Sequence, residues 1–179
     1  MFKRLHFWLT ADRLGPDMPL IHMLLYFPCL MSWICRKKFK YFGENSEFRP
    51  GAYADCCSSI SIGENVVIRP GVMLFAETGE DTPNLIIEDD VLMGPGIHMY
   101  VPNHTYNDPD KLIFEQGFTY KGDIIIRRGA WIGANSIILS GVEIGEHSIV
   151  VAGSVITNNV EPYTVVAGNP SRIVKRINY

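Results

Sequence analysis

Aliphatic residues return every six positions over a long part of this chain. In the stretch GANSIILSGVEIGEHSIVVAGS, from Gly133 to Ser154, they stand at Ile138, Ile144 and Val150. An amphipathic helix needs apolar spacings of three and four, and a half-buried strand needs a spacing of two. A period of six suits a short flat strand followed by a corner. Three such units close one triangular coil, and successive coils stack on a common core.

From Ile126 the chain divides into six consecutive hexads: IRRGAW, IGANSI, ILSGVE, IGEHSI, VVAGSV and ITNNVE. The first residue of each hexad is Ile or Val, and the fifth is small or aliphatic. Gly and Asn near the corners supply backbone conformations that β-branched residues resist. We therefore expect the first-position side chains of successive coils to stack in one core.

The same phase continues towards the N-terminus, and the coils are expected to start at Phe42, Ile62, Ile87, Ile126 and Ile144. The gaps between these starts are 20, 25, 39 and 18 residues, so a constant period of eighteen leaves insertions of 2, 7 and 21 residues. The sequence therefore predicts a mainly β fold, a parallel β-helix of about five triangular coils over residues 42–161. An inserted loop is expected at 100–123, and a C-terminal cap at 162–179. At ~4.8 Å per layer the prism would be about 24 Å tall.

The region before the repeats, residues 1–41, is apolar and is predicted to be helical. Its segment Met18 to Cys35 is short for a membrane span, and His22 and Pro28 interrupt it. We expect one or two short helices on the end of the domain, with Asp17 as an N-cap. No small-residue cleavage site marks a signal peptide. A peripheral membrane contact, helped by the basic run 36–38, is an alternative role for this segment.

Composition narrows the class of protein. The net charge is -3 and no long basic stripe is present, which argues against a nucleic-acid binder. The four cysteines show neither a metal spacing nor a secreted disulfide framework. They indicate a reducing compartment, so we expect a cytoplasmic protein. If the N-terminal segment contacts a membrane, we expect the protein at the inner face of that membrane.

The hexads resemble the left-handed parallel β-helix of hexapeptide-repeat acyltransferases, from about Phe42 to Ile177. The left hand comes from this resemblance, because general crossover rules favour the opposite hand. The insertion after Met99, YVPNHTYNDPDKLIFEQGFTYKGD, resembles the loop of galactoside, maltose and nodulation-factor O-acetyltransferases, and more closely that of polysaccharide O-acetyltransferases. The resemblance implies acetyl-CoA as co-substrate, no metal, and a saccharide acceptor. It also implies a homotrimer with active sites between subunits.

In that family a histidine at the place of His104 deprotonates the acceptor hydroxyl. A sugar hydroxyl attacks a thioester poorly, and a neutral imidazole can remove its proton during attack, typically contributing about 10²- to 10⁴-fold. A carboxylate or carbonyl must fix the tautomer of such a base. Glu80, Asp81 and Asp108 are the candidates in this chain.

Four positions are expected to contact the acceptor: Asn103 beside His104, Asp81, His98 and Arg69. His98 closes its hexad and should point outward near the cleft, as a substrate contact or as a plain surface residue. Arg69 stands where several sugar acetyltransferases carry an Asn, which hints at an anionic or differently shaped sugar. The aromatic and aliphatic residues of the insertion suggest that it docks rather than moves freely: Tyr106, Leu112, Ile113, Phe114, Phe118 and Tyr120.

Two segments match the coenzyme A side of the family. The stretch 131–134, WIGA, places Trp131 by the acyl-thioester arm and Gly133 beside the backbone N–H of Ala134, which matches the donor to the thioester carbonyl. Such a fixed donor is worth about 10²- to 10³-fold. Ala152 and Gly153 match the lining of the pantetheine groove. Packing of the Trp131 side chain on a neighbouring subunit is the structural alternative.

The ending VVAGNPSRIVKRI resembles the segment that closes the family's β-helix. Arg172 matches a position that meets coenzyme A phosphates, and Lys175 or Arg176 can add charge. A capping role without a ligand is the alternative. Asn158 departs from the family, which often has a cofactor-binding Lys there.

The sequence thus predicts an acetyl-CoA-dependent O-acetyltransferase that acts on a saccharide, in bacterial surface-polysaccharide assembly, by direct attack on the thioester. N-acetylation of an amino sugar, and acetylation of serine or an antibiotic, keep the fold and change the acceptor. A zinc enzyme like the γ-type carbonic anhydrases would need three converging histidines. A non-enzymatic scaffold whose loop binds a partner is the remaining alternative.

Overall fold

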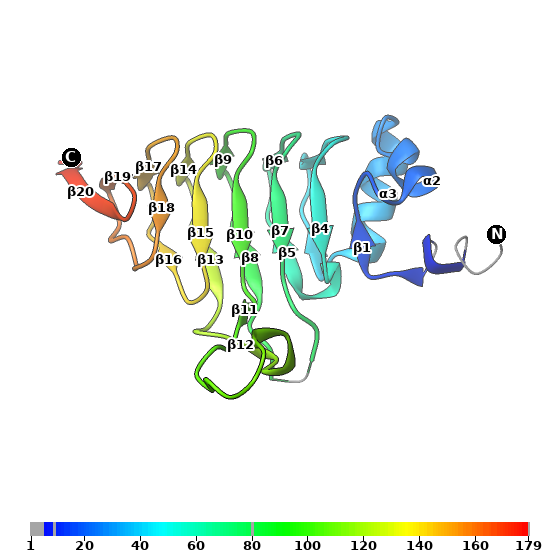
Figure 1. Ribbon diagram of the computed structural model, residues 1–179. Helices are drawn as coiled ribbons and strands as arrows, with labels where there is room; N and C mark the ends of the chain where they lie inside the picture. Colours follow the sequence, from blue (N-terminus) through cyan, green and yellow to red (C-terminus); the bar gives the residue numbers. More distant parts are fainter. Residues whose placement is uncertain (1–5, 9, 80, 179) are drawn as a thin grey trace.

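The computed structural model describes residues 6–8, 10–79 and 81–178, and it shows a prism of stacked triangular coils with two helices at one end (Figure 1). The chain passes along three flat faces in turn, and the strands of successive coils pair in parallel. The coils wind in the left-handed sense, as the resemblance implied. The predicted parallel β-helix of about five coils is therefore confirmed.

Each face is built of strands of two or three residues, with longer strands only at the C-terminal end of face two. Face one contains β2 (Tyr41–Phe42), β5 (Ile60–Ile62), β8 (Leu85–Ile87), β13 (Ile124–Ile126) and β16 (Glu143–Ile144). Face two contains β3 (Glu47–Phe48), β6 (Val67–Ile68), β9 (Leu92–Met93), β14 (Trp131–Ile132), β17 (Ile149–Val150), β19 (Thr164–Gly168) and β20 (Ser171–Arg176). Face three contains β4 (Tyr53–Asp55), β7 (Met73–Phe75), β10 (His98–Tyr100), β15 (Ile137–Leu139) and β18 (Val155–Ile156). Faces one and three are each a single ladder, whereas face two consists of two ladders, β3 with β6 and β9 onwards, the second ending in the longer strands β19 and β20.

The predicted coil starts stack on one another in register. Phe42 pairs with Ile62, Ile62 with Ile87, Ile87 with Ile126, and Ile126 with Ile144. All five side chains are buried in the core. Full burial of an aliphatic side chain is worth roughly 1.5–3 kcal/mol, so the column is a main source of stability. The arithmetic of insertions read from the sequence is confirmed at each step.

Small polar residues are buried at the corners, and their hydroxyl groups are hydrogen-bonded there. Ser136 and Ser148 are fully buried, and their hydroxyls donate to the carbonyls of Gly133 at 2.8 Å and Glu161 at 2.7 Å. Asn135 adopts a left-handed φ of 57° at its corner. Such a conformation is rare for β-branched residues, which explains the Gly and Asn pattern of the repeats.

Two helices close the N-terminal end of the core. They are α2 (Pro19–Leu24) and α3 (Pro28–Lys38), and each starts with a proline, whose missing N–H costs nothing in the first turn. Asp17 does not cap α2, contrary to expectation; the N-cap is Met18, and the Asp17 carboxylate pairs with Arg13 at 3.1 Å. In the part of the chain described here, neither helix is long and apolar enough to cross a bilayer.

All three insertions leave the prism at the same corner, the one that follows face three. The shortest contains the single turn η1 (Cys57–Ser59), the second spans residues 76–84, and the longest spans 101–123. The longest contains the two-stranded hairpin β11 (Asn103–His104) and β12 (Phe118–Thr119), with the turn η2 (Ile113–Glu115) between them. It projects from the prism below the third coil in Figure 1.

Candidate active site

The ends of the long insertion are fixed on its neighbouring coils. The backbone N–H of Lys121 donates to the Ser140 hydroxyl at 3.0 Å, and the Gly141 N–H donates to the Gly122 carbonyl at 3.0 Å. Asp123 accepts a hydrogen bond from the Asn84 N–H at 2.7 Å. The hairpin is therefore held at its base, and its tip extends beyond the prism.

His104 stands on this hairpin at the edge of a cleft of about 500 Å³. Its exposed ring packs on Phe118, with the ring centroids 4.9 Å apart. Its backbone N–H donates to the Asn103 side-chain oxygen at 2.9 Å. The same cleft is lined by Asn103, Tyr106, Thr119 and Lys121 from the insertion. The predicted base and one predicted acceptor contact, Asn103, thus share one cleft.

The floor of the cleft is a ladder of aromatic rings on face three. Phe75 and Tyr100 stack with centroids 5.2 Å apart and ring planes 13° apart, and both line the cleft. Tyr53 continues the ladder, 5.3 Å from Phe75. His98 lies beside it, with Nδ1 2.8 Å from the Tyr100 hydroxyl, so it contacts the cleft through Tyr100 rather than lining it.

Two of the expected orienting carboxylates, Asp81 and Asp108, are not hydrogen-bonded to His104. Asp108 instead pairs with Lys111 at 3.1 Å, and Asp81 lies exposed in the second insertion. Glu80 lies outside the described residues. Within the part of the chain that the structure covers, both ring nitrogens of His104 are without a hydrogen-bond partner.

The apolar side chains of the insertion are mostly exposed in the single chain, so the docking of the insertion through them stays a prediction. The exposed fractions are 70% for Tyr106, 70% for Leu112, 56% for Ile113, 89% for Phe114 and 54% for Phe118. Tyr120 alone of the six packs against the hydrophobic core.

A second cluster lies at the corner between faces two and three. There the coils approach so closely that a Cβ on Gly133 would lie 2.4 Å from the Ala152 nitrogen. The backbone N–H groups of Ala134 and Ala152 donate no hydrogen bond to any described residue. Gly153, with a φ of 73°, completes the turn. The corner thus presents two free donors, one coil apart, as the prediction for this segment requires.

The surface next to this corner is apolar. Trp131 is 48% exposed on face two, where it pairs with Leu92 and Ile149. Arg69 lies on the same corner line, two coils nearer the N-terminus, and its Nε donates to the Met93 carbonyl at 2.9 Å. Arg69 therefore lies on the corner line of Ala134 and is not among the residues that line the His104 cleft.

The C-terminal strands form an antiparallel hairpin that closes face two. Arg176 is engaged by an ion pair with Glu161. Arg172 and Lys175 are exposed and form no ion pair with any residue in the described ranges. Of the three cations predicted for phosphate contact, these two are free to bind one. Asn158 is exposed, and its side-chain amide donates to Thr157 at 3.1 Å.

One chain does not bring the two clusters together. His98 of β10 pairs with Ile137 of β15, so the strands of face three run side by side in the same direction. Ala134 lies at the corner before these strands, whereas His104 lies beyond the corner that follows them.

In the described ranges, no group of three His, Cys, Asp or Glu side chains converges in a way that could bind a zinc ion. His98 bonds to Tyr100 on face three, and His104 stands on the hairpin. His147 stacks on Tyr163, 5.4 Å away, at another corner.

Sequence reasoning did not find the aromatic floor of the cleft. Phe75 and Tyr100 are 25 residues apart, and the seven-residue insertion between them hides their common place in the repeat. Once that insertion is subtracted, each follows a buried first-position residue, Leu74 or Met99, and the two must stack. This offset was the available signal.

The fold and the exposed backbone donors define a class, the hexapeptide-repeat transferases. Residues 123–158 match the family described as bacterial transferase hexapeptide (six repeats). Galactoside O-acetyltransferase of Escherichia coli strain K12 is 32% identical over 145 residues, which cover 81% of this chain and 68% of that protein. The chain belongs to the hexapeptide-repeat acetyltransferases.

Solved structures of the family agree with the architecture. A hexapeptide-repeat acetyltransferase of Vibrio cholerae O1 biovar eltor, complexed with acetyl coenzyme A, has a TM-score of 0.75 and 26% identity, and the match covers 89% of this chain and 84% of that one. A galactoside acetyltransferase in complex with coenzyme A has a TM-score of 0.71 and 28% identity, with coverages of 87% and 78%.

Proposed function

We propose that this protein transfers an acetyl group from acetyl-CoA to a hydroxyl group of a saccharide, in the assembly of a bacterial surface polysaccharide. The observation that carries the proposal is an exposed imidazole at the edge of an aromatic-lined cleft, whose ring nitrogens have no hydrogen-bond partner among the described residues. Aromatic faces such as Phe75, Tyr100 and Phe118 suit the apolar face of a sugar ring, while Asn103, Thr119 and Lys121 supply polar contacts.

The donor-side residues fit acetyl-CoA. The free N–H groups of Ala134 and Ala152 lie one coil apart and can bond to carbonyl oxygens of an extended pantetheine chain. The exposed Trp131 would cover its thioester end, and Arg172 and Lys175 would meet its phosphates. Acetyl-CoA supplies the activated acetyl group, and the protein needs no covalent intermediate of its own.

In the proposed reaction His104 accepts the proton of the acceptor hydroxyl while the hydroxyl oxygen bonds to the acetyl carbon. The Ala134 N–H donates to the carbonyl oxygen, where negative charge develops, and stabilises that charge. The carbon–sulfur bond then breaks. The protonated imidazole gives its proton to the departing sulfur, so His104 ends the cycle neutral.

We further propose a homotrimer with the active sites between subunits. The separation of His104 and Ala134 within one chain supports this proposal, because the two residues act on one acetyl group. The exposed apolar side chains of the insertion support it as well, since a neighbouring subunit could cover them. The four cysteines are free, which suits the reducing cytoplasm as the location.

A matched pair of variants tests the proposal. His104→Asn should lower kcat about 10²- to 10⁴-fold in an assay of free thiol released from acetyl-CoA. His147→Asn is the control, because His147 is also exposed and Asn tolerates its φ of 54°. Both variants should unfold near the wild-type temperature.

The acceptor panel pairs hydroxyl sugars with amino sugars. Transfer to hydroxyl sugars that depends on His104 supports the proposal. Transfer to amines alone would show an N-acetyltransferase, and full activity of His104→Asn would remove the general base from the mechanism.

A further inference from the structure

The helices at the N-terminal end are apolar on two sides. One side of each helix packs on the core through Ile21 in α2 and through Met31, Ile34 and Cys35 in α3. A surface helix of a monomeric protein usually presents polar residues opposite such a stripe. Here the opposite side is apolar too.

The outer side of this end forms a cluster of large exposed side chains, which we call the cap patch. Along each segment the exposed apolar residues recur at spacings of three and four. Their exposed fractions are Leu20 46%, Met23 56%, Tyr26 66%, Phe27 55%, Leu30 42% and Trp33 53%. Large apolar side chains exposed together in one short segment indicate an interaction site on a folded protein.

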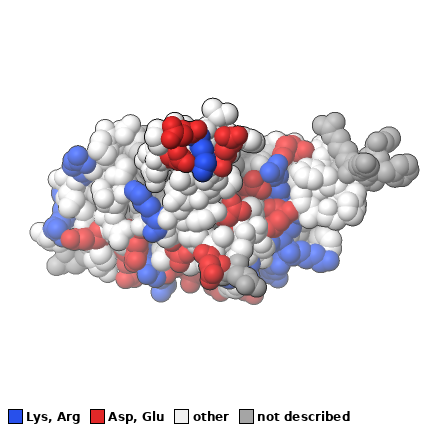
Figure 2. All heavy atoms as spheres, turned by 60° about the horizontal axis from the view of Figure 1, so that its bottom comes forward, with Lys and Arg blue, Asp and Glu red and all other residues white. Residues whose placement is uncertain are grey.

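The charge of the chain divides at the same place. Residues 1–40 contain seven Lys and Arg against two Asp, a net charge of +5, whereas residues 41–179 contain nine Lys and Arg against seventeen Asp and Glu, a net charge of -8. Figure 2 shows Lys and Arg side chains near the N-terminal end, while over the coils and the insertion acidic side chains lie among the remaining Lys and Arg. A net charge of -3 for the whole chain hides this division.

Arg13 pairs with Asp17 and Asp55, but the cations of residues 36–40 have no acidic partner among the described residues. Arg36 and Lys37 form no ion pair with a described residue, and Lys38 and Lys40 donate to the uncharged oxygens of Ala11 and Asn84. Cations of the coils are more often paired, as Arg127 is with Glu88 and Glu143. Free cations beside apolar surface are available to an external anion.

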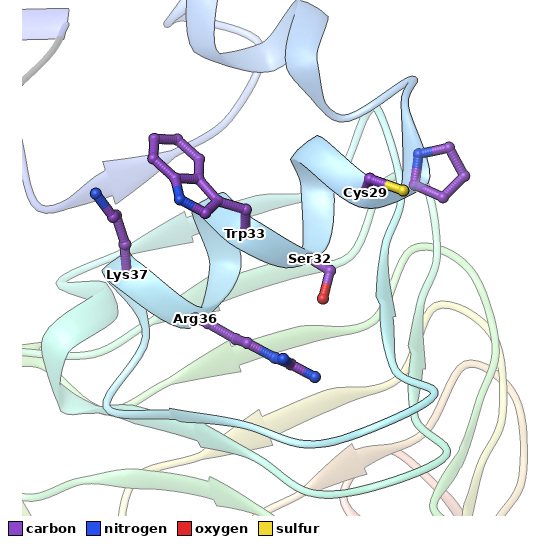
Figure 3. Close-up of a pocket in the computed structure, with 6 residues that line it drawn as sticks. Cys29, Ser32, Trp33, Arg36 and Lys37 are labelled. Carbon is purple, nitrogen blue, oxygen red and sulfur yellow. The ribbon is translucent and has the colours of Figure 1, made fainter.

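Trp33 and the cations stand together on α3. The Lys37 ammonium lies 4.3 Å from the Trp33 ring centroid, and the two side chains point to the same side of the helix (Figure 3). The side chains of Ser32 and Arg36 point to the opposite side of α3 in Figure 3. All four side chains line a groove of about 550 Å³ along this helix. An indole with a flanking ammonium suits the boundary between acyl chains and headgroups.

We propose that the cap patch binds the surface of an anionic lipid bilayer, so that the enzyme is a peripheral membrane protein. The apolar side chains of α2 and α3 would enter the acyl boundary, and Arg36 and Lys37 would meet lipid phosphates. A second copy of the chain is the weaker occupant, because two caps of net charge +5 would repel each other. This proposal does not depend on the transfer reaction.

Vesicle cosedimentation of the full-length protein tests it, without acetyl-CoA or acceptor. Phosphatidylcholine vesicles that contain phosphatidylglycerol should sediment the protein, added salt should weaken binding, and vesicles of phosphatidylcholine alone should bind little. Trp33→Ser should weaken binding about tenfold, since it removes a large apolar anchor. The double variant Arg36→Glu with Lys37→Glu should weaken it by at least about tenfold.

The controls make equal changes away from the cap. Phe114→Ser removes an aromatic side chain that is 89% exposed on the insertion, and Lys111→Glu with Arg128→Glu makes the same charge change outside the cap. Both should bind vesicles like the wild type. Equal losses in the controls, or a wild type that ignores anionic vesicles, would overturn the proposal. A change of oligomeric state confined to the cap variants would instead identify the patch as a contact between copies. The cap variants should transfer acetyl groups to a soluble acceptor at the wild-type rate.

Discussion

Two corners of the prism follow different rules. The corner between faces two and three carries no insertion in any coil, and its residues approach the next coil at contact distance. The corner after face three carries all three insertions, the longest with His104 at the edge of the cleft. The regular corner offers backbone groups at a fixed spacing, whereas the other corner offers side chains. We infer that binding of the acetyl donor and choice of the acceptor are separated between them.

Removal of the long insertion should have the largest effect. Replacing residues 101–123 with Ser-Gly, the pair that turns the next coil at Ser140–Gly141, should abolish transfer with a loss at least as large as the roughly 10²- to 10⁴-fold expected for His104→Asn. The stack should still form, because the strands on both sides keep their partners. Circular dichroism and thermal unfolding measure the fold, and thiol release measures transfer. A protein that unfolds would show that the insertion also supports the coils.

A methyl group at the regular corner should cost stability. Gly133→Ala places a Cβ 2.4 Å from the Ala152 nitrogen, so the backbone of two coils must shift. We expect a loss of about 1–3 kcal/mol in the free energy of unfolding, as for overpacked cores, together with a higher KM for acetyl-CoA. Gly79→Ala is the control, since its φ is not left-handed and a Cβ there meets only the side chain of Thr82, which can shift more cheaply than backbone. Urea unfolding compares the two variants, and equal losses would contradict the special role of the regular corner.

The shortest insertion should be more rigid than the longest. The reactivity of its Cys56 thiol measures this, and the expected effect is smaller than those above. Burial, and then the Asp55 charge, raise the pKa of Cys56 from 9.0 to about 11. The thiolate is the reactive form, so alkylation of Cys56 should be slow at neutral pH and rise about tenfold per pH unit up to about pH 11. The folded state holds the proton more tightly than the unfolded chain, so this thiol disfavours folding progressively as pH rises above 9.0. Mass spectrometry of alkylated peptides measures the rate, with the exposed Cys29 as reference.

The sequence alone predicted the periodic parts of the fold. Phe42, Ile62, Ile87, Ile126 and Ile144 could be placed in one column because burial repeats at a fixed interval once the insertions are subtracted. Local features were harder. The prediction of Asp17 as the N-cap of α2 was wrong, because its carboxylate pairs with Arg13 instead. The position of Arg13 depends on the antiparallel pairing of β1 (Arg13–Leu14) with β4, which is a long-range contact.

The candidate site was predicted in part. The place of His104 follows from the length and position of the insertion, together with the family resemblance. The distance between His104 and Ala134 does not, since it depends on which side of a triangular coil each occupies. The exposure of Phe114 in the single chain was not predicted, because an aromatic residue in a long loop fits burial on its own chain and burial on a neighbour equally well.

The position of the insertion along the stack has a further consequence. Two coils separate the helical end from the coil that bears His104, and each coil adds about 4.8 Å. With a helix layer of about 10 Å beneath them, the His104 imidazole of a membrane-docked enzyme would stand roughly 20 Å above the lipid headgroups. If both proposals hold, the number of coils would set the height above the bilayer that an acceptor must reach.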